Sequence, residues 1–233
     1  MFMFGSCNAK HVKLPEYAIH NILPRDSFVK VEIKIEVTKC FDEENCFTQK
    51  FVGHGSGAVV RNTNKGSYIL TAGHVCEEKD FEKEAIDSGL KFKMNFEIVD
   101  IDNLRYAGSV KKIDNKLDTC IMFVKHLAKP SIKLRNSELE IGKKYYNIAA
   151  PAAIFGENMI PILEGRYSGF WEEIGPGFAV YTIPAIGGSS GSPIVNEDGE
   201  LVGMIHSVHA HFPFVSFSPS TDQLYDFLKD VIK

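Results

Sequence analysis

One short stretch of the chain combines glycine and serine in a pattern suited to nucleophilic catalysis: Gly187-Gly188-Ser189-Ser190-Gly191-Ser192-Pro193. A nucleophilic serine needs a tight turn that exposes its hydroxyl group, and backbone N–H groups that face the developing oxyanion. Glycine permits the dihedral angles and the close approach that this geometry requires. The stretch therefore predicts a serine nucleophile within the turn.

His74 is a candidate general base for such a serine. It follows an apolar segment, Tyr68-Ile69-Leu70, and the small residues Ala72 and Gly73 let the backbone pass close behind its imidazole. A single histidine is more often structural or merely exposed, so the prediction depends on its combination with the Gly/Ser turn downstream.

Asp118 is the best candidate for a third catalytic residue, because it opens the apolar segment Thr119–Val124 between His74 and the serines. A carboxylate that enters a buried strand is costly unless it is paired. Fixing the imidazole tautomer and stabilising the imidazolium would provide that partner. Three other aspartates remain alternatives: Asp100, Asp102 and Asp114.

The segments that would position these residues are predicted to be short β-strands. Apolar and charged residues alternate from Val29 to Val37, which is typical of a half-buried strand, whereas residues 1–27 are predicted to be an N-terminal extension. Further apolar segments, separated by Gly, Pro, Asn and Asp, lie at residues 51–60, 68–70, 92–99, 106–110, 120–124, 145–149, 178–183, 194–195, 201–205 and 214–217. Many short strands at even spacing favour a barrel or sandwich.

Two helical segments are expected. Ser220 and Gln223 form a capping-box pattern, and Leu224, Phe227, Leu228, Val231 and Ile232 follow at helical spacing. A shorter helical turn is predicted from Gly73 to about Lys79. The charged segment Glu77–Glu84 is interpreted as solvated surface.

Composition excludes several functional classes. The net charge is −4 and no block of Lys and Arg occurs, so nucleic-acid binding is not expected. No apolar run reaches the roughly 18–20 residues of a membrane span, and the N-terminus has no clear signal peptide. We expect a soluble chain whose compartment and oligomeric state the sequence leaves open.

The five cysteines are an odd number and exclude a framework in which all are paired within the chain. Cys40 and Cys46 flank a polar turn, and whether they pair is left open. Cys76 and Cys120 lie in apolar segments and are expected to be buried free thiols.

Two of these motifs resemble those of one enzyme family. Thr71-Ala72-Gly73-His74-Val75, with Gly55–Val60 before it, resembles the histidine motif of chymotrypsin-like serine proteases, and Gly187–Pro193 resembles their Gly-x-Ser-Gly-(Gly/Ser)-Pro motif. The strand, turn and strand of Ile194–Gly203 look most like the bacterial high-temperature-requirement proteases and glutamyl endopeptidases. The resemblance covers roughly residues 28–233.

The resemblance implies an all-β fold of two antiparallel six-stranded β-barrels with a C-terminal α-helix. The N-terminal barrel would span about residues 28–125, and the C-terminal barrel with the final helix about residues 140–233. No appended peptide-binding domain is expected after that helix.

The resemblance also implies a serine endopeptidase that acts on protein or peptide substrates and needs neither cofactor nor metal. It assigns a catalytic triad of His74, Asp118 and Ser190, with an oxyanion hole at the N–H groups of Gly188 and Ser190. Thr119 departs from the family, which usually has an apolar residue there. The substrate-binding residues would be Pro184, Ala185, Ile186, His206, Ser207 and Val208.

These positions also predict specificity. The pocket segment Pro184–Ile186 has no carboxylate to hold Arg or Lys, so cleavage after apolar or small residues is expected, with Glu as the alternative. His206 lies one residue later than the histidine of glutamyl endopeptidases, which turns its side chain to the opposite face unless a bulge intervenes. Ser189 precedes the nucleophile where the trypsin-type activation switch needs an aspartate, so no such switch is expected.

The sequence also fits three alternatives. Gly187–Gly191 fits the Gly-x-Ser-x-Gly pattern of α/β-hydrolase esterases with Ser189 as nucleophile, but the strand–helix rhythm is missing and Pro193 lies where a helix is needed. A protease-fold binding module without turnover is a second alternative. The cluster His206, His209 and His211 suggests a zinc site, but no cysteine or carboxylate lies at a suitable spacing.

Overall fold

The computed structural model describes residues 22–42, 45–77, 79–135, 138–173 and 175–232. The fold is mostly β, with 51% of the described residues in strands and 12% in helices. This confirms the predicted all-β class. The N-terminal extension lies largely outside the described residues. Among the helices that are described, none is long and apolar enough to cross a membrane.

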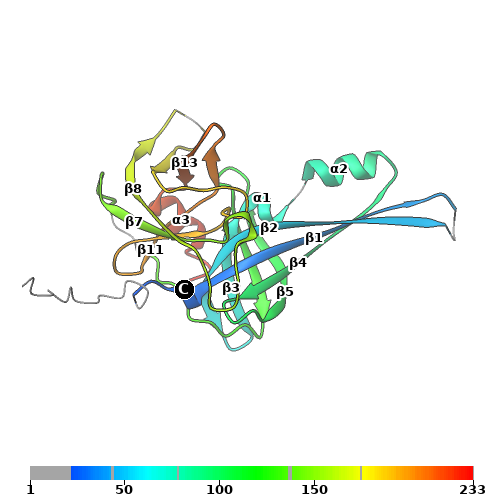
Figure 1. The fold of residues 1–233 in the computed structure, drawn as a ribbon, viewed down its shortest axis with the longest axis horizontal. Coiled ribbons are helices and arrows are strands. Elements are labelled where there is room, and N and C mark those ends of the chain that lie inside the picture. Colours follow the sequence, from blue (N-terminus) through cyan, green and yellow to red (C-terminus); the bar gives the residue numbers. More distant parts are fainter. Residues whose placement is uncertain (1–21, 43–44, 78, 136–137, 174, 233) are drawn as a thin grey trace, which may run out of the picture.

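The N-terminal half is a closed antiparallel barrel with the strand order β1-β2-β3-β6-β5-β4 (Figure 1). Its strands are β1 Phe28–Cys40, β2 Cys46–Thr63, β3 Gly66–Ala72, β4 Lys91–Asp100, β5 Arg105–Asp114 and β6 Thr119–Lys125. Two helices connect β3 to β4, namely α1 Gly73–Cys76 and α2 Lys79–Asp87. The segment expected to be only a solvated surface therefore contains a helix, whose Phe81 packs edge-on against Phe51 and Phe92.

The C-terminal half is a seven-stranded antiparallel sheet with the order β11-β10-β7-β8-β9-β13-β12. Its strands are β7 Lys144–Ile148, β8 Ile162–Trp171, β9 Phe178–Tyr181, β10 Pro193–Val195, β11 Leu201–Met204, β12 Ser207–His209 and β13 Phe212–Ser218. Where a second six-stranded barrel was expected, the described strands form a half-barrel.

The C-terminal helix α3 spans Thr221–Leu228 and confirms the predicted capping box. The Ser220 side chain accepts a hydrogen bond from the Gln223 N–H, and the Gln223 side chain accepts one from the Ser220 N–H. The helix ends at Leu228, so Val231 lies in the turn after it and Ile232 lies beyond that turn, rather than extending the helix as the spacing predicted.

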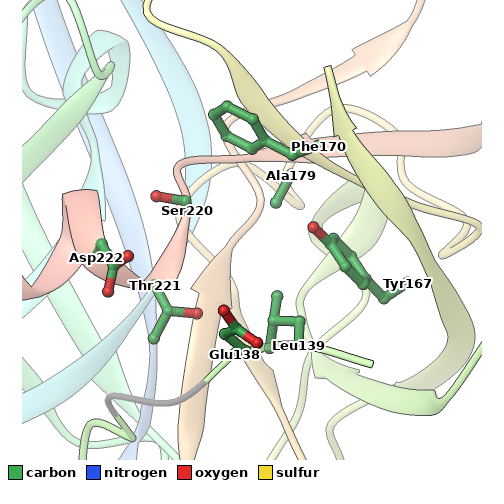
Figure 2. Close-up of a pocket in the computed structure, with 8 residues that line it drawn as sticks. All are labelled: Glu138, Leu139, Tyr167, Phe170, Ala179, Ser220, Thr221 and Asp222. Atoms are coloured by element: carbon green, nitrogen blue, oxygen red, sulfur yellow. The ribbon is translucent and has the colours of Figure 1, made fainter. Parts of the chain in front are cut away.

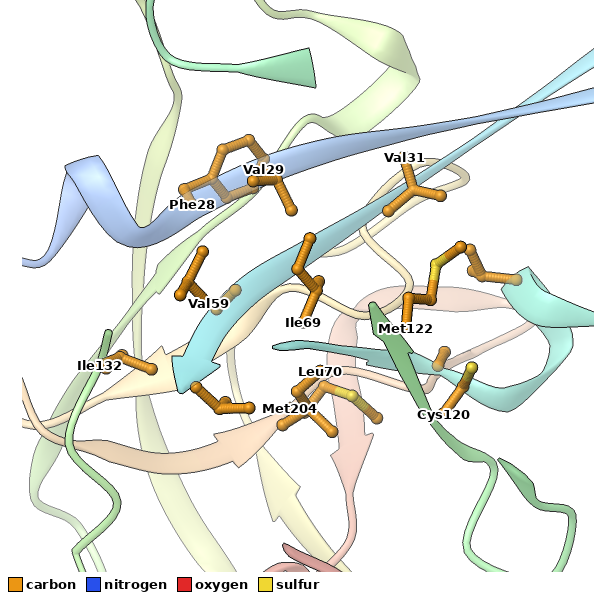
Figure 3. Close-up of a cluster of buried hydrophobic side chains, with 14 of the residues drawn as sticks. Phe28, Val29, Val31, Val59, Ile69, Leu70, Cys120, Met122, Ile132 and Met204 are labelled. Carbon is orange, nitrogen blue, oxygen red and sulfur yellow. The ribbon is translucent and has the colours of Figure 1, made fainter. Parts of the chain in front are cut away.

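The larger hydrophobic core fills the first barrel and continues toward the second sheet. Phe28, Val59, Ile69 and Met122 are fully buried in it, and Met204 of β11 reaches it from the second half (Figure 3). Because β2, β3 and β6 meet in this core, the segments that follow β3 and precede β6 are held side by side. These are the segments that carry His74 and Asp118.

The outer ends of β1 and β2 project well beyond the barrel as a long arm (Figure 1). The two strands pair without interruption from Phe28↔Ala58 to Cys40↔Cys46. Both strands are longer than predicted, because the exposed residues Cys46–Lys50 have no apolar alternation that would indicate a half-buried strand.

Four of the five cysteines form two disulfides. Cys40 and Cys46, whose pairing was left open, are joined at the tip of the arm, and Cys76 of α1 is joined to Cys120 of β6. The prediction that Cys76 and Cys120 are free thiols was therefore wrong. Both are buried as expected, but α1 and β6 bring them together across 44 residues of sequence.

Candidate active site

His74 and Asp118 lie against each other at the ends of neighbouring strands. The N–H of His74 donates to Asp118 Oδ1 at 2.8 Å, and His74 Nδ1 lies 2.8 Å from Asp118 Oδ2. A third hydrogen bond joins the Gly73 N–H to the carbonyl oxygen of Asp118 at 2.9 Å. These contacts fix the orientation of the imidazole and engage its Nδ1 with the carboxylate.

The backbone at Asp118 is held in an unusual conformation. Its φ of 49° lies in the left-handed region, which costs energy for a residue other than glycine and is often found at functional sites. Residue 73 must be small, because a Cβ there would lie 2.8 Å from Asp118 Oδ1. Burial by itself would raise the pKa of Asp118, but the hydrogen bonds and charge of His74 outweigh it and hold the pKa below its usual value.

The Gly/Ser turn packs directly against β2 of the first barrel. The Ser56 N–H donates to the carbonyl oxygen of Ser190 at 2.8 Å, and the Ser56 hydroxyl donates to the carbonyl oxygen of Gly188 at 2.7 Å. At Gly191, φ is 87° and a Cβ would lie 2.1 Å from the Ser56 carbonyl oxygen. Ser190 is thereby placed at the junction of the two halves of the molecule.

The two N–H groups predicted to form the oxyanion hole are free of other partners. Within the described part of the chain, the N–H groups of Gly188 and Ser190 make no hydrogen bond. The turn Pro151–Ala153 supports the same loop, since the Ala152 N–H donates to the Gly187 carbonyl oxygen at 2.7 Å. Two preorganised donors beside a serine suit the stabilisation of a tetrahedral oxyanion.

Ser189, the alternative nucleophile, is only 1% exposed. Its hydroxyl accepts a weak hydrogen bond from the Ile186 N–H at 3.3 Å, and its own N–H donates to the Ile186 carbonyl oxygen. Ser190 is partly exposed. The burial of Ser189 therefore favours Ser190 as the serine that a substrate can reach.

The alternative aspartates serve other structures. Asp100 is fully buried and accepts hydrogen bonds from the N–H groups of Asp102 and Leu104. Asp102 forms an ion pair with Lys129. Asp114 accepts hydrogen bonds within the turn before β6. Each of the three has a local partner other than His74.

His206 is a second histidine beside Asp118. Its Nδ1 is 3.8 Å from Asp118 Oδ2, its side chain is 7% exposed, and its ring packs against Phe178 with centroids 4.6 Å apart. Burial lowers its pKa to about 4, which the charge of Asp118 opposes and that of His74 reinforces. The side chain of His206, which was predicted to bind substrate, is thus buried beside the Asp118 carboxylate.

The remaining residues predicted to bind substrate lie in the segments before and after the Gly/Ser turn. Pro184, Ala185 and Ile186 lead into it, and the Ala185 N–H donates to the carbonyl oxygen of Pro213. Ser207 and Val208 lie in β12, which pairs with β13. His209 and His211 follow at the exposed end of that hairpin, with ring centroids 6.3 Å apart. In the described residues no cluster of three metal-ligating side chains occurs.

A separate cavity of about 590 Å³ lies between the second sheet and the start of α3 (Figure 2). It is lined by Glu138, Leu139, Tyr167, Phe170, Ala179, Ser220, Thr221 and Asp222. None of the predicted catalytic or substrate-binding residues belongs to this lining. The cavity is therefore distinct from the candidate active site.

Sequence reasoning missed the residues that hold the site together. Ser56 contacts both Gly188 and Ser190, and its hydroxyl also accepts a hydrogen bond from the Ala150 N–H at 3.0 Å. Thr71 donates to the Ser56 carbonyl oxygen at 2.7 Å. Small polar residues in strands were the only signal available, and that signal did not indicate a partner more than 130 residues away.

The closed barrel, the half-barrel and the C-terminal helix define a chymotrypsin-like fold. The family model of the trypsin-like peptidase domain matches residues 55–204, which is more than half of the chain and includes His74, Asp118 and Ser190. The chain therefore belongs to the trypsin-like peptidase domain family. No curated protein gives a significant match to it.

Proposed function

We propose that the protein is a serine endopeptidase with the triad His74, Asp118 and Ser190. The observation that carries the proposal is the doubly hydrogen-bonded pair of His74 and Asp118, next to a Gly/Ser turn with two free N–H groups. Membership of the trypsin-like peptidase domain family supports the same conclusion.

The proposed reaction follows the two-step route of acyl transfer. Ser190 Oγ attacks the peptide carbonyl carbon while His74 Nε2 accepts the hydroxyl proton, and the resulting oxyanion is stabilised by the N–H groups of Gly188 and Ser190. His74 then donates its proton to the leaving amine, and an acyl-enzyme remains. Water attacks this ester, His74 again transfers the proton, and Ser190 is released.

Asp118 has two roles in this scheme. Its Oδ2 holds the Nδ1–H tautomer of His74, so that Nε2 carries the lone pair, and its charge stabilises the imidazolium that forms in both steps. The lowered pKa of Asp118 favours the ionised carboxylate that this role requires. Neither step requires a metal or organic cofactor.

The proposed pocket for the residue before the scissile bond is formed by Pro184, Ala185 and Ile186 on one side and by Ser207 and Val208 on the other. No carboxylate occurs at these positions, so cleavage after apolar or small residues is favoured over cleavage after Arg or Lys. The buried side chain of His206 contacts Asp118 rather than an open pocket, which argues against the specificity of the glutamyl endopeptidase branch.

Incubation with a diverse peptide library, followed by mass spectrometry of the products, tests the activity and the pocket together. We expect wild-type protein to cleave after apolar or small residues, and Ser190→Ala to cleave nothing. Dominant cleavage after Arg or Lys would refute the pocket assignment. A wild-type protein that neither cleaves nor reacts with a fluorophosphonate would instead be a binding module on a protease fold.

A further inference from the structure

Strand β2 has a free edge along the arm. From Cys46 to Gly57 it pairs with β1, whereas its pairing with β3 begins only at Ala58. Among the described residues, no other strand pairs with the outer side of this stretch. An unpaired strand edge is a template for another extended chain, and proteins usually shield such edges.

Alternation of the backbone groups shows which residues face this edge. The Phe41 N–H donates to the Asn45 carbonyl oxygen, so odd-numbered residues of β1 and β2 bond to each other across the hairpin. The even-numbered residues of β2 must therefore point outward. Ser56 agrees, since its N–H donates to Ser190 and its carbonyl oxygen accepts from Thr71.

Four residues continue this outward row toward the tip: His54, Val52, Lys50 and Thr48. In the described chain, β1 is the strand that pairs with this stretch, and the outward N–H groups of these four residues donate to no loop or turn carbonyl. From His54 to Thr48 the row is roughly 20 Å long at ~3.4 Å per residue. It can pair with an extended segment of about seven residues.

The row begins at the candidate active site. A Cβ on Gly55 would lie 2.8 Å from the Val75 side chain and 3.3 Å from the Ser190 carbonyl oxygen. Val75 is the neighbour of His74, and in the proposed reaction His74 must lie close to the leaving amine of the substrate in order to protonate it. The half of a substrate that departs with this amine therefore lies nearest to β2.

We propose that the outer edge of β2 between His54 and Thr48 binds the substrate segment that follows the scissile bond, as an added antiparallel strand. This proposal rests on the proposed function. The directions agree, because β2 runs from the tip toward Ser190 while the segment after the scissile bond runs away from it. Backbone pairing supplies affinity with little dependence on sequence.

Side chains on the arm indicate the kind of segment that fits. Phe47, Phe51 and Val52 are 65%, 40% and 56% exposed. These apolar groups flank the edge and would contact apolar residues of the added strand. The substrate class is thus an extended polypeptide with apolar residues over about seven positions after the cleavage site.

The experiment compares two fluorogenic peptides with the same sequence before the scissile bond and either two or eight residues after it. In wild-type protein, we expect the longer peptide to have about a tenfold higher kcat/KM, because several backbone hydrogen bonds are added. Val52→Pro removes one outward N–H without breaking a bond to β1, and should abolish most of this gain.

Two control variants isolate the effect. Val52→Ala removes the side chain but keeps the N–H, so it should keep most of the gain. Met94→Pro places a proline in β4, on the opposite free edge of the arm. Met94 lies beside Ile35, and Ile35 directs its backbone hydrogen bonds to Phe51 of β2, so the N–H of Met94 points away from β1. This variant should keep the full gain. Fluorophosphonate labelling and turnover of the short peptide should be normal in all three.

An equal kcat/KM for both peptides in wild-type protein would overturn the proposal while leaving the proposed function intact. So would a gain that survives Val52→Pro, or one that Met94→Pro abolishes equally. Light scattering adds a further test, since a dimer of the wild type that Val52→Pro dissociates would mean that the edge binds a second copy of the chain. Loss of labelling in wild-type protein would contradict the proposed function instead.

Discussion

His206 Nδ1 lies 3.8 Å from Asp118 Oδ2, the same oxygen that lies 2.8 Å from His74 Nδ1. Two imidazoles therefore face one carboxylate, one partly exposed and the other buried against Phe178. Within the described residues, the Nε2 atom of His206 is buried without a hydrogen-bond partner. This environment disfavours the protonated ring and keeps a neutral imidazole behind the Asp118 carboxylate.

His206 should make the folded state sensitive to mild acid. Burial lowers its pKa from 6.5 to about 4, so the unfolded chain binds more protons between these values and stability falls as the pH falls through this window. From pH 7.5 to 5 the loss due to this residue is about 2 kcal/mol. Urea unfolding of wild type and His206→Gln at both pH values measures it. An equal loss in both proteins would contradict the assignment.

Gly73→Ala should impair turnover more than folding. Its Cβ would lie 2.8 Å from Asp118 Oδ1 and 3.1 Å from the Thr119 nitrogen, so the carboxylate that orients His74 must shift. We expect kcat to fall by a factor of about 100, because small displacements of catalytic groups are costly. Gly156→Ala is the matched control, since its nearest contact would be 3.7 Å away. Steady-state kinetics of both variants provide the comparison.

The two disulfides should differ in their effects. The Cys76–Cys120 disulfide closes a loop of 44 residues and links α1, which carries His74, to β6, which follows Asp118. The double variant Cys76→Ala/Cys120→Ala should therefore lower the free energy of unfolding by about 4 kcal/mol and also reduce kcat. Cys40–Cys46 closes six residues at the tip, and its removal should cost about 2 kcal/mol and leave kcat on short peptides unchanged. Denaturant unfolding and kinetics of the two double variants distinguish them. Equal kcat losses would refute this division.

No new N-terminus should be needed for activity. In the trypsin-type switch, a buried ammonium group pairs with an aspartate before the nucleophile, but here that residue is the neutral, buried Ser189, which is hydrogen-bonded to Ile186. The chain that begins at Met1 should therefore react with a fluorophosphonate as fast as variants trimmed toward Phe28. An inert full-length chain that one specific truncation activates would show that such a switch exists.

Much of the fold could be predicted from the sequence for strands and helices that bury one face and expose the other. Alternation in β1 and the capping box of α3 indicated their elements correctly. Strand β8 was missed because Gly165 and Gly169 interrupt it, and because Tyr167 is its one buried residue while the others are exposed or half-buried. The outer part of β2 was missed for a related reason, since it is stabilised by pairing with β1 and not by burial.

The candidate site was predictable to the extent that its residues carry local motifs. Glycines beside His74 and Ser190 mark close backbone contacts, and the structure accounts for them through Asp118 and Ser56. Contacts between segments that are distant in the sequence have no comparable local motif. The disulfide between Cys76 and Cys120, and the hydrogen bonds from Ser56 to the Gly/Ser turn, depend on strand order and register, which single residues do not reveal.

The central claim is that Ser190 is the nucleophile, and mapping a fluorophosphonate adduct tests it most directly. Intact mass should show one adduct on the wild-type chain, and fragmentation should place it on Ser190. Ser189→Ala should still be labelled because its hydroxyl is buried, whereas Ser190→Ala should remain unmodified. An adduct that persists in Ser190→Ala and disappears in Ser189→Ala would contradict the account.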